Sequence, residues 1–185
     1  MPCKHFDVNK IEVRMKEGLL VIPLSLHIDE MDGDAVLCPG EVYLNGKTYK
    51  FMNRSCRTVY RRKNKVIKLE SYWNKSDFEK YSQNKFESNV RIPSEIKNWF
   101  AESSDYVETS IFIPNVRKTL YVSATMQDYV APVRLTTHED VTKVNKVIKH
   151  HSASLKNVGD IGEYNVIVSK RGPVVIDYGY NSNWI

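Results

Sequence analysis

The chain has 185 residues, of which 42% are hydrophobic and 26% are charged, and its formal net charge is +5. These proportions are typical of an ordinary soluble globular protein that is long enough to bury a core. No apolar run approaches the roughly 18–20 residues that cross a bilayer, and the N-terminus has no secretory signal. The three cysteines are scattered, which indicates reduced thiols. We therefore expect a cytoplasmic protein that makes no membrane contact.

The first elements are predicted to be strands. Residues 1–40 contain one apolar stretch, residues 19–26, followed by an acidic turn, and are expected to form an extension that packs on the main domain or lies beside it. Alternating apolar and polar residues then predict short antiparallel strands at 41–44, 48–52, 58–61 and 65–69. Asn45-Gly46 is typical of the tight turn of a hairpin.

Helical and strand patterns alternate in the second half of the chain. Residues 76–100 have a helical pattern that Pro93 divides, with a capping-box sequence at Ser76. Strands are predicted at 109–113 and 118–124. A helix is predicted to begin at Thr136 or Thr137 and to end near residue 151. Two strands, 164–169 and 173–177, follow with a turn between them.

Basic residues concentrate between Arg54 and Lys68, which indicates an anionic partner or a solvated hairpin tip. The sequence has no zinc-finger spacing, no aromatic motif of an RNA-binding sheet and no helix with a continuous basic face. Nucleic acid is therefore ranked below a nucleotide as the partner.

The candidate chemical residues come late in the chain. Asp160 and Asn165 are five residues apart, and Asp177 follows a hydrophobic strand and precedes Gly179 by two residues. Carboxylate and amide oxygens are ligands that Mg²⁺ prefers. Together with Lys68 in Val-Ile-Lys-Leu, this order of motifs resembles the protein-kinase-like superfamily over residues 41–180. The nearest likeness is to small bacteriophage kinase-like proteins and the aminoglycoside-phosphotransferase branch.

This resemblance implies an α+β fold with a kinase-like N-lobe, made of an antiparallel sheet and a helical segment, and a minimal C-lobe. The implied divisions are an extension (1–40), the N-lobe (41–128) and a rudimentary C-lobe (129–185). ATP and Mg²⁺ are the implied cofactors. The resemblance assigns phosphate contact to Lys68, orientation of the attacking hydroxyl to Asp160, and metal binding to Asn165 and Asp177.

Further roles follow from the same resemblance. A helix glutamate should hold Lys68, and both Glu87 and Glu95 are candidates. Glu87 lies at the better distance in sequence from Lys68, but Glu95 is slightly favoured because the number of residues between it and the following connector fits the family better. Met126 is expected to face adenine. Residues 53–58, where the family has a glycine-rich loop, contain no glycine, so Ser55 and the arginines would contact phosphate instead.

Two functions are compatible with these motifs. The first is an ATP–Mg²⁺-binding kinase-like protein, acting as a phosphotransferase or a pseudokinase in the cytoplasm of a phage-infected cell. The second is a non-catalytic scaffold, either a phage virion component or an inhibitor that binds a host protein. The missing glycines and the six residues left after Gly179 favour the second function, whereas the set of Lys68, Asp160, Asn165 and Asp177 favours the first.

Overall fold

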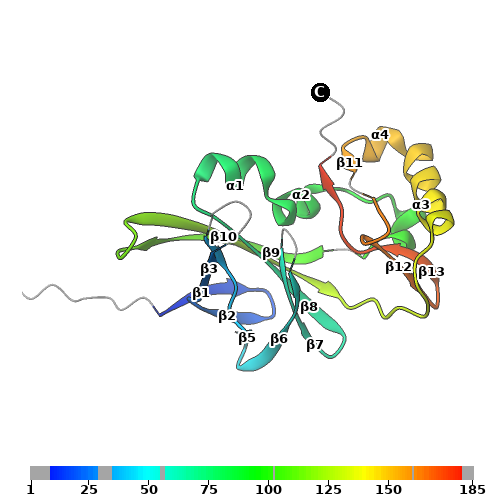
Figure 1. Ribbon diagram of the computed structural model, residues 1–185. Coiled ribbons are helices and arrows are strands. Elements are labelled where there is room, and N and C mark those ends of the chain that lie inside the picture. The colour runs from blue at the N-terminus through cyan, green and yellow to red at the C-terminus, as the bar shows by residue number, and fades with distance from the viewer. Residues whose placement is uncertain (1–8, 29–34, 55–56, 102, 160, 181–185) are drawn as a thin grey trace, which may run out of the picture.

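The computed structural model describes residues 9–28, 35–54, 57–101, 103–159 and 161–180. One antiparallel sheet dominates it (Figure 1). In spatial order its strands are β1 (Lys10–Met15), β2 (Gly18–Pro23), β5 (Glu41–Leu44), β6 (Lys47–Arg54), β7 (Thr58–Arg62), β8 (Lys65–Tyr72), β10 (Lys118–Asp128) and β9 (Ser103–Ile113).

The two ends of this sheet approach one another. The carboxylate of Asp105 on β9 accepts hydrogen bonds from the backbone N–H of Lys16 at 2.7 Å and of Glu17 at 3.2 Å, just after β1. Asp105 has φ of 57°, a left-handed conformation that Asp tolerates better than most residues. The sheet is therefore nearly closed and resembles a barrel.

The hairpins follow the sequence pattern. Asn45 and Gly46 both have positive φ, as the expected tight turn between β5 and β6 requires. Alternate residues of β5 are buried, whereas five consecutive residues of β8 are buried because both of its faces are covered. The inward-facing apolar residues of the sheet form one core, which includes Leu20, Ile22, Ile67, Leu69 and Met126.

Three short helical segments lie between β8 and β9: α1 (Lys75–Tyr81), α2 (Gln83–Asn89) and the 3₁₀ segment η1 (Ser94–Trp99). The predicted break at Pro93 is confirmed. The predicted capping box at Ser76 is wrong, because Asn74 is the N-cap and accepts a hydrogen bond from the Ser76 N–H at 2.8 Å. Figure 1 shows α1 and α2 on one side of the sheet.

The C-terminal part packs around a second core, which includes Phe100, Val144 and Tyr178. The predicted helix is confirmed as α3, with a capping box between Thr137 and Asp140. The helices of this part are α3 (His138–His150) and α4 (Ser152–Leu155). Two small two-stranded sheets lie beside them, β11 (Val158–Gly159) with β14 (Gly179–Tyr180) and β12 (Val166–Ser169) with β13 (Gly172–Val175). A third pair comes from the N-terminal part, β3 (Leu26–Ile28) with β4 (Ala35–Leu37).

The expected α+β fold, a kinase-like N-lobe with a minimal C-lobe, is wrong. Strands account for 47% and helices for 24% of the structure, and the main sheet nearly closes. The physical reason lies in residues 10–23, which were expected beside the domain. They form a hairpin whose second strand pairs with β5, and Leu20 and Ile22 are fully buried in the main core. The division at residues 40 and 128 stays a prediction.

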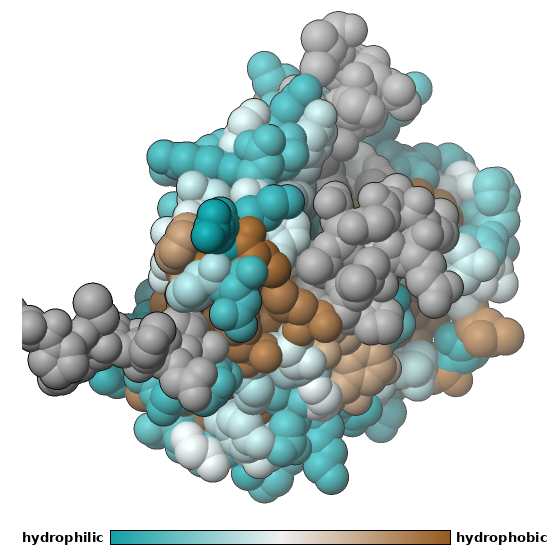
Figure 2. Space-filling view, turned by 60° about the vertical axis from the view of Figure 1, so that its left-hand side comes forward, coloured by the Kyte–Doolittle hydropathy of each residue, from teal (hydrophilic) through white to brown (hydrophobic). Residues whose placement is uncertain are grey.

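The surface is mixed. Figure 2 shows one face on which hydrophilic residues surround a band of hydrophobic residues near the centre. Among the described residues, no helix combines the length and the apolar character that crossing a membrane requires.

Candidate active site: a buried charged cluster

The candidate site begins with the alternation of side chains along β8. Successive residues of a strand point to opposite faces, so Lys68 and Glu70 share one face while Ile67 and Leu69 point into the main core on the other. Lys68 and Glu70 are both buried. Because buried charges are stable only when they are paired and hydrogen-bonded, the face of β8 under α2 must supply polar partners.

Glu70 fixes the start of α2 above this face. Its carboxylate accepts hydrogen bonds from the Ser82 hydroxyl at 2.8 Å and from the backbone N–H of Gln83 at 2.8 Å and Asn84 at 2.9 Å. A carboxylate at a helix N-terminus satisfies amides that have no partner within the helix. This anchor sets the orientation of α2 and turns Glu87, one turn further on, toward Lys68.

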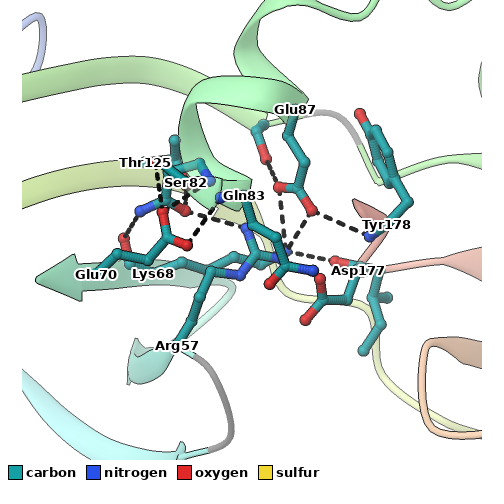
Figure 3. A network of polar contacts seen from close by, with 12 residues as sticks. Arg57, Lys68, Glu70, Ser82, Gln83, Glu87, Thr125, Asp177 and Tyr178 are labelled. Carbon is teal, nitrogen blue, oxygen red and sulfur yellow. Dashed lines mark hydrogen bonds and ion pairs between the residues drawn. The ribbon is translucent and has the colours of Figure 1, made fainter. Parts of the chain in front are cut away.

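Four ionisable side chains meet at this point: Arg57, Lys68, Glu87 and Asp177, which we call the charged cluster (Figure 3). The Lys68 Nζ lies 3.5 Å from Glu87 Oε2 and donates a hydrogen bond to the Ile176 carbonyl. The Arg57 Nη2 lies 2.7 Å from Glu87 Oε1 and also pairs with Asp177 Oδ1. The cluster therefore joins the beginning of β7, β8, α2 and the segment after β13.

The Glu87 carboxylate is the centre of the cluster. Besides the two cations, it accepts hydrogen bonds from the Ser103 hydroxyl at 2.7 Å and from the Tyr178 backbone N–H at 3.1 Å. Tyr178 is buried with its ring edge-on to Phe100, at a centroid distance of 5.5 Å. Glu87 thus attaches the Asp-Tyr-Gly segment to the sheet.

Burial controls the protonation of the cluster. Arg57, Lys68 and Glu87 are 1%, 4% and 3% exposed, whereas the Asp177 side chain is 20% exposed. Burial and the adjacent guanidinium lower the pKa of Lys68 to about 8. Burial alone would raise the pKa of Glu87. The positive charges of Lys68 and Arg57 have the larger, opposite effect and lower the Glu87 pKa to about 2. Burial raises the pKa of Asp177, and Arg57 and Lys68 offset that effect only in part.

Sequence reasoning included Arg57 among the arginines expected to contact phosphate, but it missed that Arg57 is buried and paired with Glu87 and Asp177. Its Nη1 donates to Asn84 Oδ1 at 3.0 Å, and the Asn84 amide in turn donates to the Lys68 carbonyl at 3.1 Å. Burial opposes the charge of Arg57, but Glu87 and Asp177 outweigh burial and raise its pKa. Arg57 belongs to a run of basic residues, and nothing in that run distinguishes a buried arginine from an exposed one.

Two other predicted site residues, Glu95 and Met126, lie outside the cluster. Glu95 lies on η1 with its side chain 61% exposed, 3.6 Å from His151 Nδ1. Met126 is fully buried in the main core. The backbone carbonyl of Asn165 accepts a hydrogen bond from the Ile176 N–H at 2.9 Å, which places the Asn165 backbone beside the segment after β13 that carries Asp177. Asp160 and Ser55 lie outside the described residues.

Of the two candidate glutamates, the structure thus pairs Glu87 with Lys68. Comparison of the chain with protein-family models, with curated proteins and with solved structures found no match. The described residues contain no group of three or more His, Cys, Asp or Glu that could hold a metal ion. The cluster balances two cations with two carboxylates, and Asp177 is the carboxylate that reaches solvent.

Proposed function

We propose that the protein binds a nucleoside triphosphate as its magnesium complex at the charged cluster. One observation carries this proposal: Lys68, Glu87 and Asp177 lie far apart in the sequence, yet they converge on one point, with the lysine held by a buried glutamate. A lysine held in this way presents a fixed point charge to phosphate oxygens. The sequence resemblance assigns the same roles to Lys68 and Asp177, and the proposal uses that assignment without the kinase fold.

Asp177 and Asn165 would hold the magnesium ion. Magnesium in nucleotide sites is usually bound by one or two protein carboxylates together with phosphates and water, so a larger cluster of acidic residues is not required. Asp177 would supply a partly exposed carboxylate, and Asn165, whose backbone contacts Ile176 from the turn before β12, would supply a side-chain amide. This donor set has the hard oxygens that magnesium prefers.

Arg57 sets a condition on binding. Its guanidinium pairs with the Asp177 carboxylate, which is also the proposed metal ligand. Binding would therefore exchange the Arg57–Asp177 contact for a magnesium–Asp177 contact, while Glu87 and Asn84 still hold the guanidinium. The Nη2 group that loses Asp177 could then donate a charge-assisted hydrogen bond to a phosphate oxygen.

Isothermal titration calorimetry with a non-hydrolysable ATP analogue and MgCl₂ tests the proposal. We expect micromolar binding to the intact chain and its loss in Asp177→Ala, with the far-UV circular dichroism spectrum unchanged. Glu139→Ala is the control, because Glu139 is a carboxylate whose side chain is 77% exposed and whose ion pair is with Lys143, outside the cluster. Absence of heat with the intact chain, with and without magnesium, contradicts the proposal.

A second candidate, a non-catalytic scaffold that contacts another protein, is favoured by the neutrality of the cluster. Arg57 already compensates Asp177, so the cluster is complete as an internal clamp between the sheet and the C-terminal segment. Hydrophobic residues on the face in Figure 2 offer surface for such a contact. If nucleotide binds, transfer of radiolabelled phosphate to a generic protein substrate separates a phosphotransferase from a nucleotide-binding scaffold.

A further inference from the structure

A cavity of about 660 Å³ lies apart from the charged cluster, between the main sheet and the β12–β13 hairpin. Its walls come from the β7–β8 turn, the end of η1, the segment after β10 and the turn between β12 and β13. Figure 1 shows β7, β8 and the β12–β13 hairpin at the same lower right side of the molecule. None of the four residues of the charged cluster lines this cavity.

Backbone hydrogen bonds hold the walls of the cavity in place. The Ala101 N–H donates to the Val175 carbonyl at 2.8 Å and joins the η1 wall to the hairpin. The Tyr129 N–H donates to the Asn64 carbonyl at 2.8 Å and joins the segment after β10 to the β7–β8 turn. A cavity whose walls are joined in this way is preformed, and a ligand does not have to order it on binding.

The charged residues in the described lining of the cavity are mostly basic. Its only carboxylate is Asp128, which lies 2.8 Å from the Lys65 ammonium and is thereby compensated. The guanidinium of Arg61 stacks on the ring of Tyr129, another lining residue, at 3.5 Å from the ring centroid. The basic lining side chains are Lys65, Lys97, Lys170 and Arg171.

The cavity also has an apolar part. Phe100, Ala101 and Val174 line it and are largely buried, so they form a firm apolar wall beside the cations. Small-molecule sites typically combine an apolar lining with a few polar groups in a volume of roughly 300–1,000 Å³. The cavity has these features and a pronounced excess of positive charge.

We propose that this cavity binds a phosphorylated small molecule that carries an apolar or aromatic group. The lysines and Arg171 would hold the phosphate, because guanidinium and ammonium groups form charge-assisted hydrogen bonds with it. The apolar wall at Phe100 would take the remainder of the ligand. Single-stranded nucleic acid is disfavoured, because it is bound by basic side chains and aromatic platforms that follow an extended groove, whereas these residues surround one compact volume.

Phenyl phosphate, which combines the two groups in one molecule, is the probe for this site. We expect a titration followed by ¹⁵N–¹H NMR to shift the amide resonances of the lining residues Phe100, Ala101, Lys170, Arg171 and Val174. Inorganic phosphate should bind more weakly than phenyl phosphate. The double variant Lys170→Glu, Arg171→Glu should weaken phenyl phosphate binding by at least about tenfold, since two charge-assisted contacts are lost. Lys146→Glu, Lys156→Glu, at two exposed lysines that do not line the cavity, is the charge-matched control.

Asp177→Ala separates this site from the charged cluster, because it should leave phenyl phosphate binding unchanged. An equal loss of binding in the Lys146→Glu, Lys156→Glu variant and in the Lys170→Glu, Arg171→Glu variant overturns the proposal, as does the absence of shifts at the lining residues. A single-stranded oligonucleotide that binds more tightly than phenyl phosphate, through the same residues, overturns it in favour of a nucleic-acid surface.

Discussion

Replacement of Glu87 by glutamine tests whether the charged cluster stabilises the fold. Glutamine keeps the shape of Glu87 but removes the charge that faces Arg57 and Lys68. Removal of one partner from a buried ion pair typically destabilises a protein by about 3–5 kcal/mol, because the remaining charge stays buried without compensation. The Glu87 pKa of about 2 in place of 4.5 gives a consistent figure of about 3 kcal/mol, at about 1.4 kcal/mol per pKa unit.

The pH dependence follows from the direction of this shift. Since the pKa of Glu87 is lower in the folded chain than in the unfolded chain, its stabilising contribution is complete above about pH 4.5 and is lost as the pH falls toward 2. Urea unfolding of both proteins between pH 7 and pH 2 measures this contribution. We expect Glu87→Gln to be less stable by about 3 kcal/mol at pH 7 and the difference to close at low pH.

Glu95→Gln is the matched control for this comparison. Glu95 is the other glutamate that the sequence offered as a partner of Lys68, but its side chain is exposed and lies near His151. Exposed ion pairs contribute about 0–1 kcal/mol, so this variant should unfold almost as the unmodified chain does. A Glu87→Gln difference below about 1 kcal/mol, or one that does not change with pH, refutes the reasoning.

Three further predictions concern Arg57, the edges of the sheet and α3. Arg57→Ala leaves Glu87 and Asp177 with Lys68 as the one remaining cation of the charged cluster, and should lower the free energy of unfolding by about 3 kcal/mol in chemical denaturation. An unchanged value would mean that the guanidinium does not stabilise the cluster. Asp105→Ala removes the acceptor of the Lys16 and Glu17 amides, so their hydrogen exchange should accelerate while the amides of β8 stay protected. Thr137→Ala removes the hydroxyl of the α3 capping box and should lower the free energy of unfolding by about 1 kcal/mol in urea. No loss of stability would show that the Asp140 side chain caps the helix without the Thr137 hydroxyl.

The sequence by itself determined the local elements of this protein. Alternation of apolar residues and the Asn45-Gly46 turn identified the hairpin of β5 and β6, because strand pairing across a two-residue turn depends on neighbouring residues only. The acidic residues Glu139 and Asp140 before an apolar stripe placed the start of α3 at Thr136 or Thr137 for the same reason, and the structure shows Thr137 as the N-cap. Lys68 and Asp177 were also found from local motifs.

Only the tertiary structure decided how these elements combine. The closure of the sheet depends on contacts between Asp105 and residues 16–17, which are about ninety positions away, and no local pattern encodes such a contact. The choice of Glu87 over Glu95 depends on the orientation of α2, which Glu70 fixes from the sheet. Arg57 joined the cluster because buried carboxylates require compensating charge, and that requirement arises only when distant segments pack together.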